Sequence, residues 1–159
     1  MLTQNQILKL LYENYAVVFP EIDSKQVLQS SVVLAKAGVP PIPTEYVSFL
    51  GATNGLSWNG FVLYALHQIE REKGLYYHPG IMNTYPASIK NPLMRKKLCL
   101  GYAPESLIIY DAPTKTFQVR DRYSFEVIFS TPHFVELLSW IVQPLLNKGT
   151  SPSTVVDAD

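Results

Sequence analysis

The sequence predicts an α+β fold: a single domain in which N-terminal helices and one C-terminal helix pack around a twisted antiparallel sheet of about five to six strands. Helical patterns occupy much of the first 53 residues, and four short strand patterns follow one another between residues 98 and 129. An apolar helix pattern comes after these strands. Helices and strands that are segregated along the chain are typical of α+β folds and not of doubly wound ones.

The composition supports one globular domain. Of the 159 residues, 47% are hydrophobic and 16% are charged, which provides enough apolar side chain for a buried core. We expect residues 1–148 to form this domain, and residues 149–159, which are rich in small, polar and acidic residues, to form a flexible tail. Thirteen basic residues balance thirteen acidic ones, so direct nucleic-acid binding is not expected.

The cysteine usage and the hydropathy favour a cytoplasmic location. Cys99 is the single cysteine, so no internal disulfide can form, which fits a reducing compartment. The first residues lack the basic and apolar pattern of a signal peptide, and no apolar run is long enough to cross a membrane. We therefore expect a cytoplasmic protein with no membrane contact.

Two helices are predicted before residue 40. In the first, Ile7 and Leu11 lie on one apolar face, and Thr3 or Asn5 can cap its start. A second helix is predicted from about residue 23 to 37. Asp23 or Ser24 can cap its start, and Gly38 can end it in the left-handed conformation.

A third helix is predicted from Pro43 to about residue 53. Pro41 and Pro43 impose an extended approach, and Pro43 is suited to the first position of a helix. Asn54 and Gly55 are expected to end this helix, because Gly55 can adopt a left-handed conformation there.

The next predicted feature is a β-hairpin. Asn59 and Gly60 form the strongest tight-turn signal in the chain, and the apolar run 61–66 after them predicts an interior strand. Residues 68–97 show no clear period, so short helical turns and loops are expected there.

Four short strands and a helix are predicted in the C-terminal half. The strands are separated by turn residues, which is typical of an antiparallel meander. In one of them Phe117 and Val119 alternate with Gln118 and Arg120, so one face is expected to be buried and the other more exposed. The last helix is predicted to start at about Thr131–Pro132 and to end or kink at Pro144.

No catalytic or metal-binding motif is present. His67, His78 and His133 are far apart in the sequence, so no local metal-ligand spacing exists, and P-loop, GxGxxG and GxSxG motifs are absent. Asp111 and two later carboxylates lie on or near neighbouring strands, but solvated strand ends are favoured over an acid/base pair. A buried thiol is the favoured interpretation of Cys99.

Aromatic and charged residues outside regular patterns are the candidates for partner contacts. Tyr76, Tyr77 and His78 are grouped in the segment GLYYHPG, and aromatic residues in such positions are common at interfaces. The competing interpretation, that the two tyrosine rings fold over the edge of the core, is slightly favoured. Trp58, beside the Asn59-Gly60 turn, poses the same choice, and for it a place in the core is favoured over a contact surface. The complete set of candidate contact residues is Trp58, Tyr76, Tyr77, His78, Asp111, Arg120 and Arg122.

Several segments in sequential order carry a family resemblance. They are Pro41-Ile-Pro43, Tyr46-Val-Ser-Phe49-Leu50, Thr53-Asn54-Gly55, Asn59-Gly60, Leu63-Tyr64, Leu100-Gly101, Ile109-Tyr110-Asp111, Val119-Arg120-Asp121-Arg122 and Phe134-Val-Glu-Leu137-Leu138. Over roughly residues 2–146 the chain resembles the SUKH superfamily of Smi/Knr-type domains, and in particular its YrhA-like branch. It departs from many members at Ala65, where they have glycine, and at the turn GYAPES.

The resemblance implies a fold and a role. The fold is α+β with a twisted antiparallel sheet, which agrees with the pattern of elements. Bacterial members of this superfamily are mostly immunity proteins, which bind and neutralise a cognate polymorphic toxin, often a nuclease or a deaminase. The implied partner is therefore a protein toxin, no cofactor is implied, and a homo-oligomer is compatible with the role.

Three functions follow as hypotheses. The first is an immunity protein that neutralises its toxin by direct stoichiometric binding. The alternative is a general scaffold or regulatory interaction module. A small enzyme that uses carboxylates or His and Tyr is disfavoured by the missing motifs.

Overall fold

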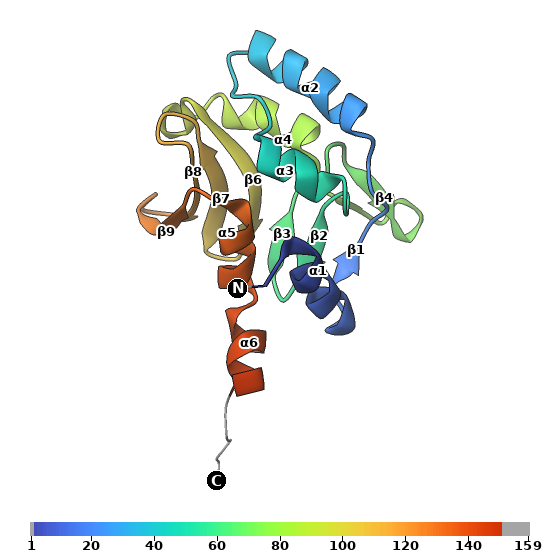
Figure 1. Ribbon diagram of the computed structural model, residues 1–159. Helices are drawn as coiled ribbons and strands as arrows, with labels where there is room; N and C mark the ends of the chain where they lie inside the picture. Colours follow the sequence, from blue (N-terminus) through green and yellow to red (C-terminus); the bar gives the residue numbers. More distant parts are fainter. Residues whose placement is uncertain (1, 151–159) are drawn as a thin grey trace.

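The chain folds around a seven-stranded antiparallel sheet (Figure 1), and the computed structural model describes residues 2–150. The helices are α1 (Gln4–Glu13), α2 (Ser24–Lys36), α3 (Thr44–Leu50), α4 (Ile81–Ser88), α5 (Phe134–Ile141) and α6 (Gln143–Thr150), with 3-10 turns η1 (Glu72–Gly74) and η2 (Pro92–Met94). The strands of the large sheet are β1 (Val17–Val18), β2 (Leu56–Trp58), β3 (Phe61–Leu63), β6 (Lys97–Ala103), β7 (Ser106–Asp111), β8 (Thr116–Asp121) and β9 (Val127–Thr131). Strands β4 (Ile69–Arg71) and β5 (Tyr76–His78) pair separately as a two-stranded sheet.

The predicted α+β class and single domain are confirmed. The strand order across the large sheet is β1-β2-β3-β6-β7-β8-β9, so the four C-terminal strands form the expected meander. The sheet is larger than predicted, partly because the two-residue strand β1 pairs with β2 at its edge. Of the predicted tail, residues 149 and 150 belong to α6, and residues 151–159 lie outside the described residues.

The two faces of the large sheet are covered differently. In Figure 1, α1, α3 and α5 lie in front of the sheet, and α4 lies behind it. We call these the front face and the rear face. On the front face the ring of Phe134 in α5 lies 5.1 Å from Tyr46, 5.2 Å from Phe49 and 5.3 Å from Phe117, measured between ring centroids. All four side chains are buried, so this cluster is the centre of the core.

The predicted N-terminal helices are present with the predicted caps. The Thr3 side chain accepts a hydrogen bond from the amide of Gln6, whose side chain in turn accepts one from the Thr3 amide. This reciprocal pair is a capping box. Asp23 caps α2, and Gly38 follows its end with φ of +79°.

The end of α3 differs from the prediction. The helix stops at Leu50, four residues before Asn54, and Pro43 is its N-cap residue. The hydroxyl of buried Thr53 donates to the carbonyls of Phe19 and Gly55, so the chain has already left the helix there.

Gly55 has the expected positive φ, +87°. It does not end a helix, however; the positive φ allows two backbone segments to pass close to each other. A Cβ atom on Gly55 would lie 2.8 Å from the Ala65 amide nitrogen, the Leu63 carbonyl oxygen and His78 Nε2. Neighbouring Asn54 accepts a hydrogen bond from the Leu66 amide. The pair therefore fixes a close crossing of two backbone segments.

The predicted hairpin at Asn59 and Gly60 is confirmed. The two residues have φ of +48° and +83°, as a type I′ turn requires, and they join Trp58 to its pairing partner Phe61. Strand β3 is shorter than the predicted run 61–66 and occupies an interior place in the sheet.

The region 68–97 is more regular than predicted. Strands β4 and β5 form a hairpin, which we call the β4–β5 hairpin, and α4 and η2 follow it. The segment GLYYHPG thus contributes a strand where a loop or irregular edge was expected. Helix α4 contains Pro86 and ends at Ser88.

The last predicted helix consists of two short helices. Helix α5 starts at Phe134 with His133 as its N-cap residue, two residues after the predicted start with Thr131 as cap and Pro132 as first residue. The Thr131 hydroxyl bonds to Glu136 and accepts from the His133 amide. Helix α5 ends at Ile141, and Pro144 stands near the start of α6, as expected for a proline that interrupts a helix. None of the helices within residues 2–150 is long and apolar enough to cross a bilayer.

Candidate functional site

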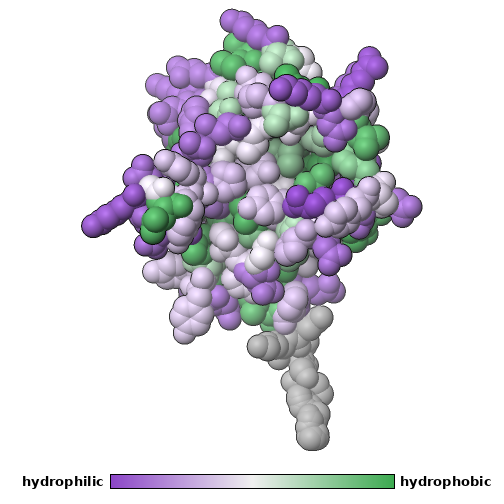
Figure 2. Space-filling model, turned by 180° about the vertical axis from the view of Figure 1, so that it is seen from behind, coloured by the Kyte–Doolittle hydropathy of each residue, from purple (hydrophilic) through white to green (hydrophobic). Residues whose placement is uncertain are grey.

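The rear face of the sheet is the face that α1, α3 and α5 leave open, and Figure 2 looks onto this side of the molecule. Its chemistry follows from the alternation of β8. Phe117 contacts α5 on the front, so Gln118 and Arg120 project to the rear. In Figure 2 most of the middle of this side is pale or purple, with green apolar side chains between and above.

A continuous chain of side-chain hydrogen bonds crosses this face. It consists of Lys97, Asp111, Thr114, Thr116, Gln118 and Arg120, and we call it the polar ladder. At one end Lys97 Nζ lies 3.4 Å from Asp111 Oδ1, and the Thr114 hydroxyl donates to Asp111 Oδ2. These bonds tie the start of β6 to the end of β7.

The ladder continues along β8 to Phe125. The two hydroxyl oxygens of Thr114 and Thr116 are 2.7 Å apart, and Gln118 Nε2 donates to the second of them over 3.0 Å. Arg120 Nε donates to Gln118 Oε1 over 2.7 Å. The guanidinium also donates to the Phe125 carbonyl over 3.0 Å and lies 4.5 Å from that ring centroid. Each side chain is therefore held by its neighbours.

The charge on Asp111 is stabilised within the ladder. Desolvation by burial acts to raise the pKa of this carboxyl group. The hydrogen bonds from Thr114 and Lys97, together with the positive charge of Lys97, outweigh it and hold the pKa below its ordinary value. Asp111 is thus ionised at neutral pH and anchors Lys97.

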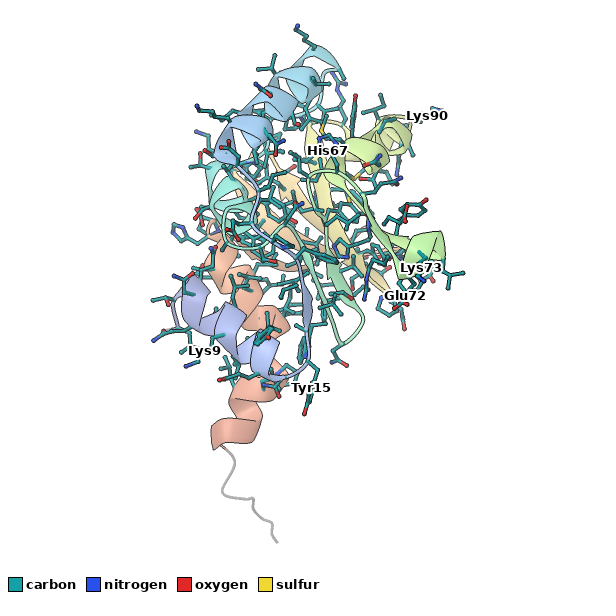
Figure 3. The ribbon with its side chains drawn as sticks, turned by 90° about the vertical axis from the view of Figure 1, so that its right-hand side faces the viewer. Lys9, Tyr15, His67, Glu72, Lys73 and Lys90 are labelled. Atoms are coloured by element: carbon teal, nitrogen blue, oxygen red, sulfur yellow. The ribbon has the colours of Figure 1, made fainter. Side chains whose placement is uncertain are left out.

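The β4–β5 hairpin flanks this face and carries exposed aromatic residues. Figure 3 shows its tip, at Glu72 and Lys73, projecting toward the rear side of the molecule, away from α1 and α5. Leu75, Tyr76 and Tyr77 are 81%, 47% and 50% exposed. Such exposure of large apolar side chains is typical of contact surfaces.

Part of this hairpin is rigidified by aromatic contacts. The Arg71 guanidinium lies 5.3 Å from the Tyr76 ring centroid and 5.9 Å from that of Phe19. The Tyr76 hydroxyl donates to Glu72 over 3.3 Å. The Tyr76 ring is therefore held by its neighbours on the hairpin before any partner binds.

His78 is not available for contact, in contrast to the prediction. It is 4% exposed, its Nε2 atom lies 2.8 Å from the Leu63 carbonyl oxygen, and its ring centroid is 4.6 Å from that of Phe19. Desolvation lowers the pKa of His78, which favours the neutral ring. Strand alternation alone does not explain the burial, because Tyr76 shares a face with His78 and is 47% exposed. The contacts with Phe19 and with the Leu63 carbonyl are what bury the His78 ring.

Three other predicted contact residues, Asp111, Arg120 and Arg122, differ in how much of their surface a partner could reach. Asp111 is buried and Arg120 is half-buried in the polar ladder, so Asp111 acts there as an anchor and offers little surface. Arg122 is exposed, donates to the Ala103 carbonyl over 3.0 Å and lies 5.5 Å from the Tyr102 ring centroid.

Trp58 lies apart from the other candidates. It is half-buried against the core and lines a hollow of about 430 Å³ together with Asn14, Tyr15 and Pro144. The rear face therefore carries the predicted contact residues Asp111 and Arg120 of β7 and β8. Tyr76 and Tyr77 lie on the β4–β5 hairpin at its flank, whereas Trp58 and His78 are not part of this surface.

The structure does not place Asp111 and Asp121 together as an acid/base pair, the interpretation that the sequence analysis disfavoured. Asp111 and Asp121 are at opposite ends of β7 and β8, since Asp111 pairs with Thr116 and Asp121 with Ser106. The Asp121 carboxylate instead accepts from the amides of the following turn, and the hydrogen bond from the Ser124 amide is the main reason that its pKa is lowered.

Cys99 is a buried thiol, as predicted. Desolvation raises its pKa, so the reactive thiolate form is disfavoured. Among residues 2–150, no cluster of three or more His, Cys, Asp or Glu residues has the arrangement to hold a metal ion.

Three exposed apolar residues on this side are not among the predicted contacts. Leu75 lies in the β4–β5 hairpin, and Ile89 and Leu93 lie directly after α4 and in η2. Their exposure had no signal in the sequence, because an isolated leucine or isoleucine is far more often buried. The two threonines of the polar ladder were not predicted either. Thr114 lies in the turn between β7 and β8, and only the register of these strands brings Thr116 opposite Asp111.

The fold and this face define a single-domain α+β protein in which α1, α3 and α5 cover the front face of the sheet and α4 covers part of the rear face. No protein-family model matches the chain, and no curated protein matches it.

Proposed function

We propose that this chain is a non-catalytic protein-binding domain that recognises its partner with the rear face of the sheet and the β4–β5 hairpin. The observation that carries the proposal is the combination of a polar ladder fixed by internal bonds with exposed Leu75, Tyr76 and Tyr77 on the β4–β5 hairpin, which lies toward the other edge of the molecule in Figure 1. Side chains that are already fixed lose little conformational entropy when a partner docks, and tyrosines are enriched at the energetic centres of interfaces.

The more specific proposal is a cytoplasmic bacterial immunity protein that neutralises a cognate toxin of the nuclease or deaminase type. The support is the resemblance to the SUKH superfamily described above, together with an α+β fold of the kind that the resemblance implies. Inhibition by stoichiometric binding requires a preformed contact surface, and the rear face has the properties of one.

Co-expression with the product of the adjacent upstream reading frame tests this proposal. We expect that frame to slow growth when expressed alone, and we expect this chain to restore growth and to form a one-to-one complex on size-exclusion chromatography. A complex without restored growth would favour the scaffold alternative. Unchanged toxicity and no complex would contradict the immunity role for this pair.

Paired variants locate the contact surface in the same assay. Leu75→Ser combined with Tyr77→Ala removes exposed apolar area from the β4–β5 hairpin and should abolish protection. The matched control is Leu28→Ser combined with Val33→Ala, which removes exposed apolar area from α2. Helix α2 lies at the top and front of the molecule, so the control should protect like the parent (Figures 1 and 3).

A further inference from the structure

A cleft lies at the top of the molecule between the segment 37–40 after α2, the end of α4, η2 and the start of β6. Its volume is about 380 Å³, within the range of small-molecule sites. The residues of its wall that are themselves buried are Val39, Met94, Leu98 and Cys99. The interior of the cleft is therefore largely apolar.

Positive charge gathers at this cleft. Arg95, Lys96 and Lys97 line it, and none of its lining residues is acidic. The balanced charge of the whole chain conceals the asymmetry: the stretch 74–104 contains four basic residues and no acidic one. The fourth is Lys90, which lies between two lining residues at the end of α4.

Of the three cations that line the cleft, two have no ion-pair partner among residues 2–150. Lys97 is bonded to Asp111 in the polar ladder. Within residues 2–150, neither Arg95 nor Lys96 forms a salt bridge, and both side chains are exposed. An uncompensated guanidinium beside an apolar cleft attracts a ligand that supplies both an anion and an apolar body.

We propose that this cleft binds a small amphipathic anion, with its apolar part against Met94 and Leu98 and its carboxylate or sulfonate group at Arg95 and Lys96. A shallower hollow of about 560 Å³ shares Gly38, Val39, Pro40 and Lys96 with the cleft, and the rest of its lining is apolar: Ala35, Pro41, Ala112 and Pro113. A longer apolar tail can extend into this second hollow. The site is separate from the β4–β5 hairpin and does not depend on the proposed toxin partner.

Titration with anilinonaphthalene sulfonate, a fluorescent amphipathic anion, tests the proposal on the full chain. We expect saturable one-to-one binding at pH 7 that weakens at high salt, because the ion contacts are screened. Decanoate should displace the probe, whereas decyltrimethylammonium, with the same chain and the opposite charge, should not. Backbone amide NMR shifts on adding decanoate should concentrate in residues 37–40 and 85–99.

Two charge-reversal variants distinguish this site from general surface charge. Lys90→Glu combined with Arg95→Glu should weaken probe binding about tenfold or more, with an unchanged melting temperature. Lys9→Glu combined with Lys25→Glu changes the net charge equally. Lys9 lies on α1, on the opposite side from Lys90, so this control should bind like the parent (Figure 3).

Three results would overturn the proposal. One is the absence of saturable binding, and another is equal weakening by the two charge-reversal pairs. The third is displacement of the probe by an acidic peptide but not by decanoate, which would assign the cleft to a protein partner.

Discussion

The front and rear faces of the sheet are made by the same strands and have opposite roles. In β8, Phe117 packs against Phe134 of α5 on the front, whereas Gln118 and Arg120 bond to one another on the rear. The front face holds the fold together through buried aromatic area. The rear face satisfies its own hydrogen bonds and leaves apolar side chains exposed around it, which is what recognition requires.

The rear face is covered only in part, by α4, and its polar side chains are satisfied by one another. Asp111 and Gln118 are each only 5% exposed, and every member of the ladder is bonded to the next from Lys97 to Arg120. The ladder keeps the surface in one conformation without making it a core. We infer that stability and binding can be changed independently by substitutions on the two faces.

The largest expected effect is on the front face. Phe134→Ala should reduce the free energy of unfolding by about 3–5 kcal/mol, because it leaves a cavity between Tyr46, Phe49 and Phe117. Arg120→Ala on the rear should cost only about 1 kcal/mol. Urea unfolding measures both, and equal losses would contradict the division between the faces.

The second effect concerns the crossing at Gly55. Gly55→Ala should cost roughly 1–2 kcal/mol for the left-handed backbone, plus the repulsion of three atoms at 2.8 Å. Gly38→Ala is the matched control, because Gly38 has φ of +79° and nothing within 4 Å of an added Cβ. We expect Gly55→Ala to lower the melting temperature clearly more. Similar losses would show that the crossing is not tight.

A third effect is the pH dependence of stability that His78 contributes. Burial lowers its pKa from the ordinary value of 6.5, so between the two values the unfolded chain binds a proton that the folded chain does not. This contribution is fully present above about pH 6.5 and is lost as the pH falls through the lowered pKa.

Urea unfolding between pH 7.5 and roughly pH 5 measures this contribution. The unfolding free energy of the parent should fall more steeply with decreasing pH than that of His78→Gln. Identical slopes for the parent and His78→Gln would mean that His78 is protonated equally in both states.

The smallest effect on stability is expected on the β4–β5 hairpin. Tyr77→Ala should change the unfolding free energy by no more than about 0.5 kcal/mol, because half of the side chain is already in water. A large fall in melting temperature would place Tyr77 in the core and remove it from the contact surface.

Local signals in the sequence predicted much of the fold. The caps at Thr3 and Asp23 and the turn at Asn59-Gly60 depend on short-range bonds, and all three are observed. The alternation in β8 predicted that Phe117 and Val119 are buried, because a strand has a period of two. Gln118, which was expected to be more exposed, is also buried, at 5%, within the polar ladder.

The β4–β5 hairpin could not be predicted in this way. Its turn places Glu72, Lys73 and Gly74 at positive φ, and neither of the first two residues is a usual turn signal. Without that hairpin the burial of His78 against Phe19 has no basis in the sequence. Gly55 shows the same limit, because its left-handed conformation was predictable and the backbone that crosses it was not.

The affinity of the complex with the co-expressed partner tests the division between the two faces most directly. Isothermal titration should compare the parent with Tyr77→Ala and with Leu28→Ala, which is 60% exposed on α2. We predict that Tyr77→Ala weakens binding at least about tenfold, as for a tyrosine at an interface centre, and that Leu28→Ala binds like the parent. Parent-like affinity of Tyr77→Ala, with loss of binding in Leu28→Ala, would contradict the assignment of recognition to the rear side.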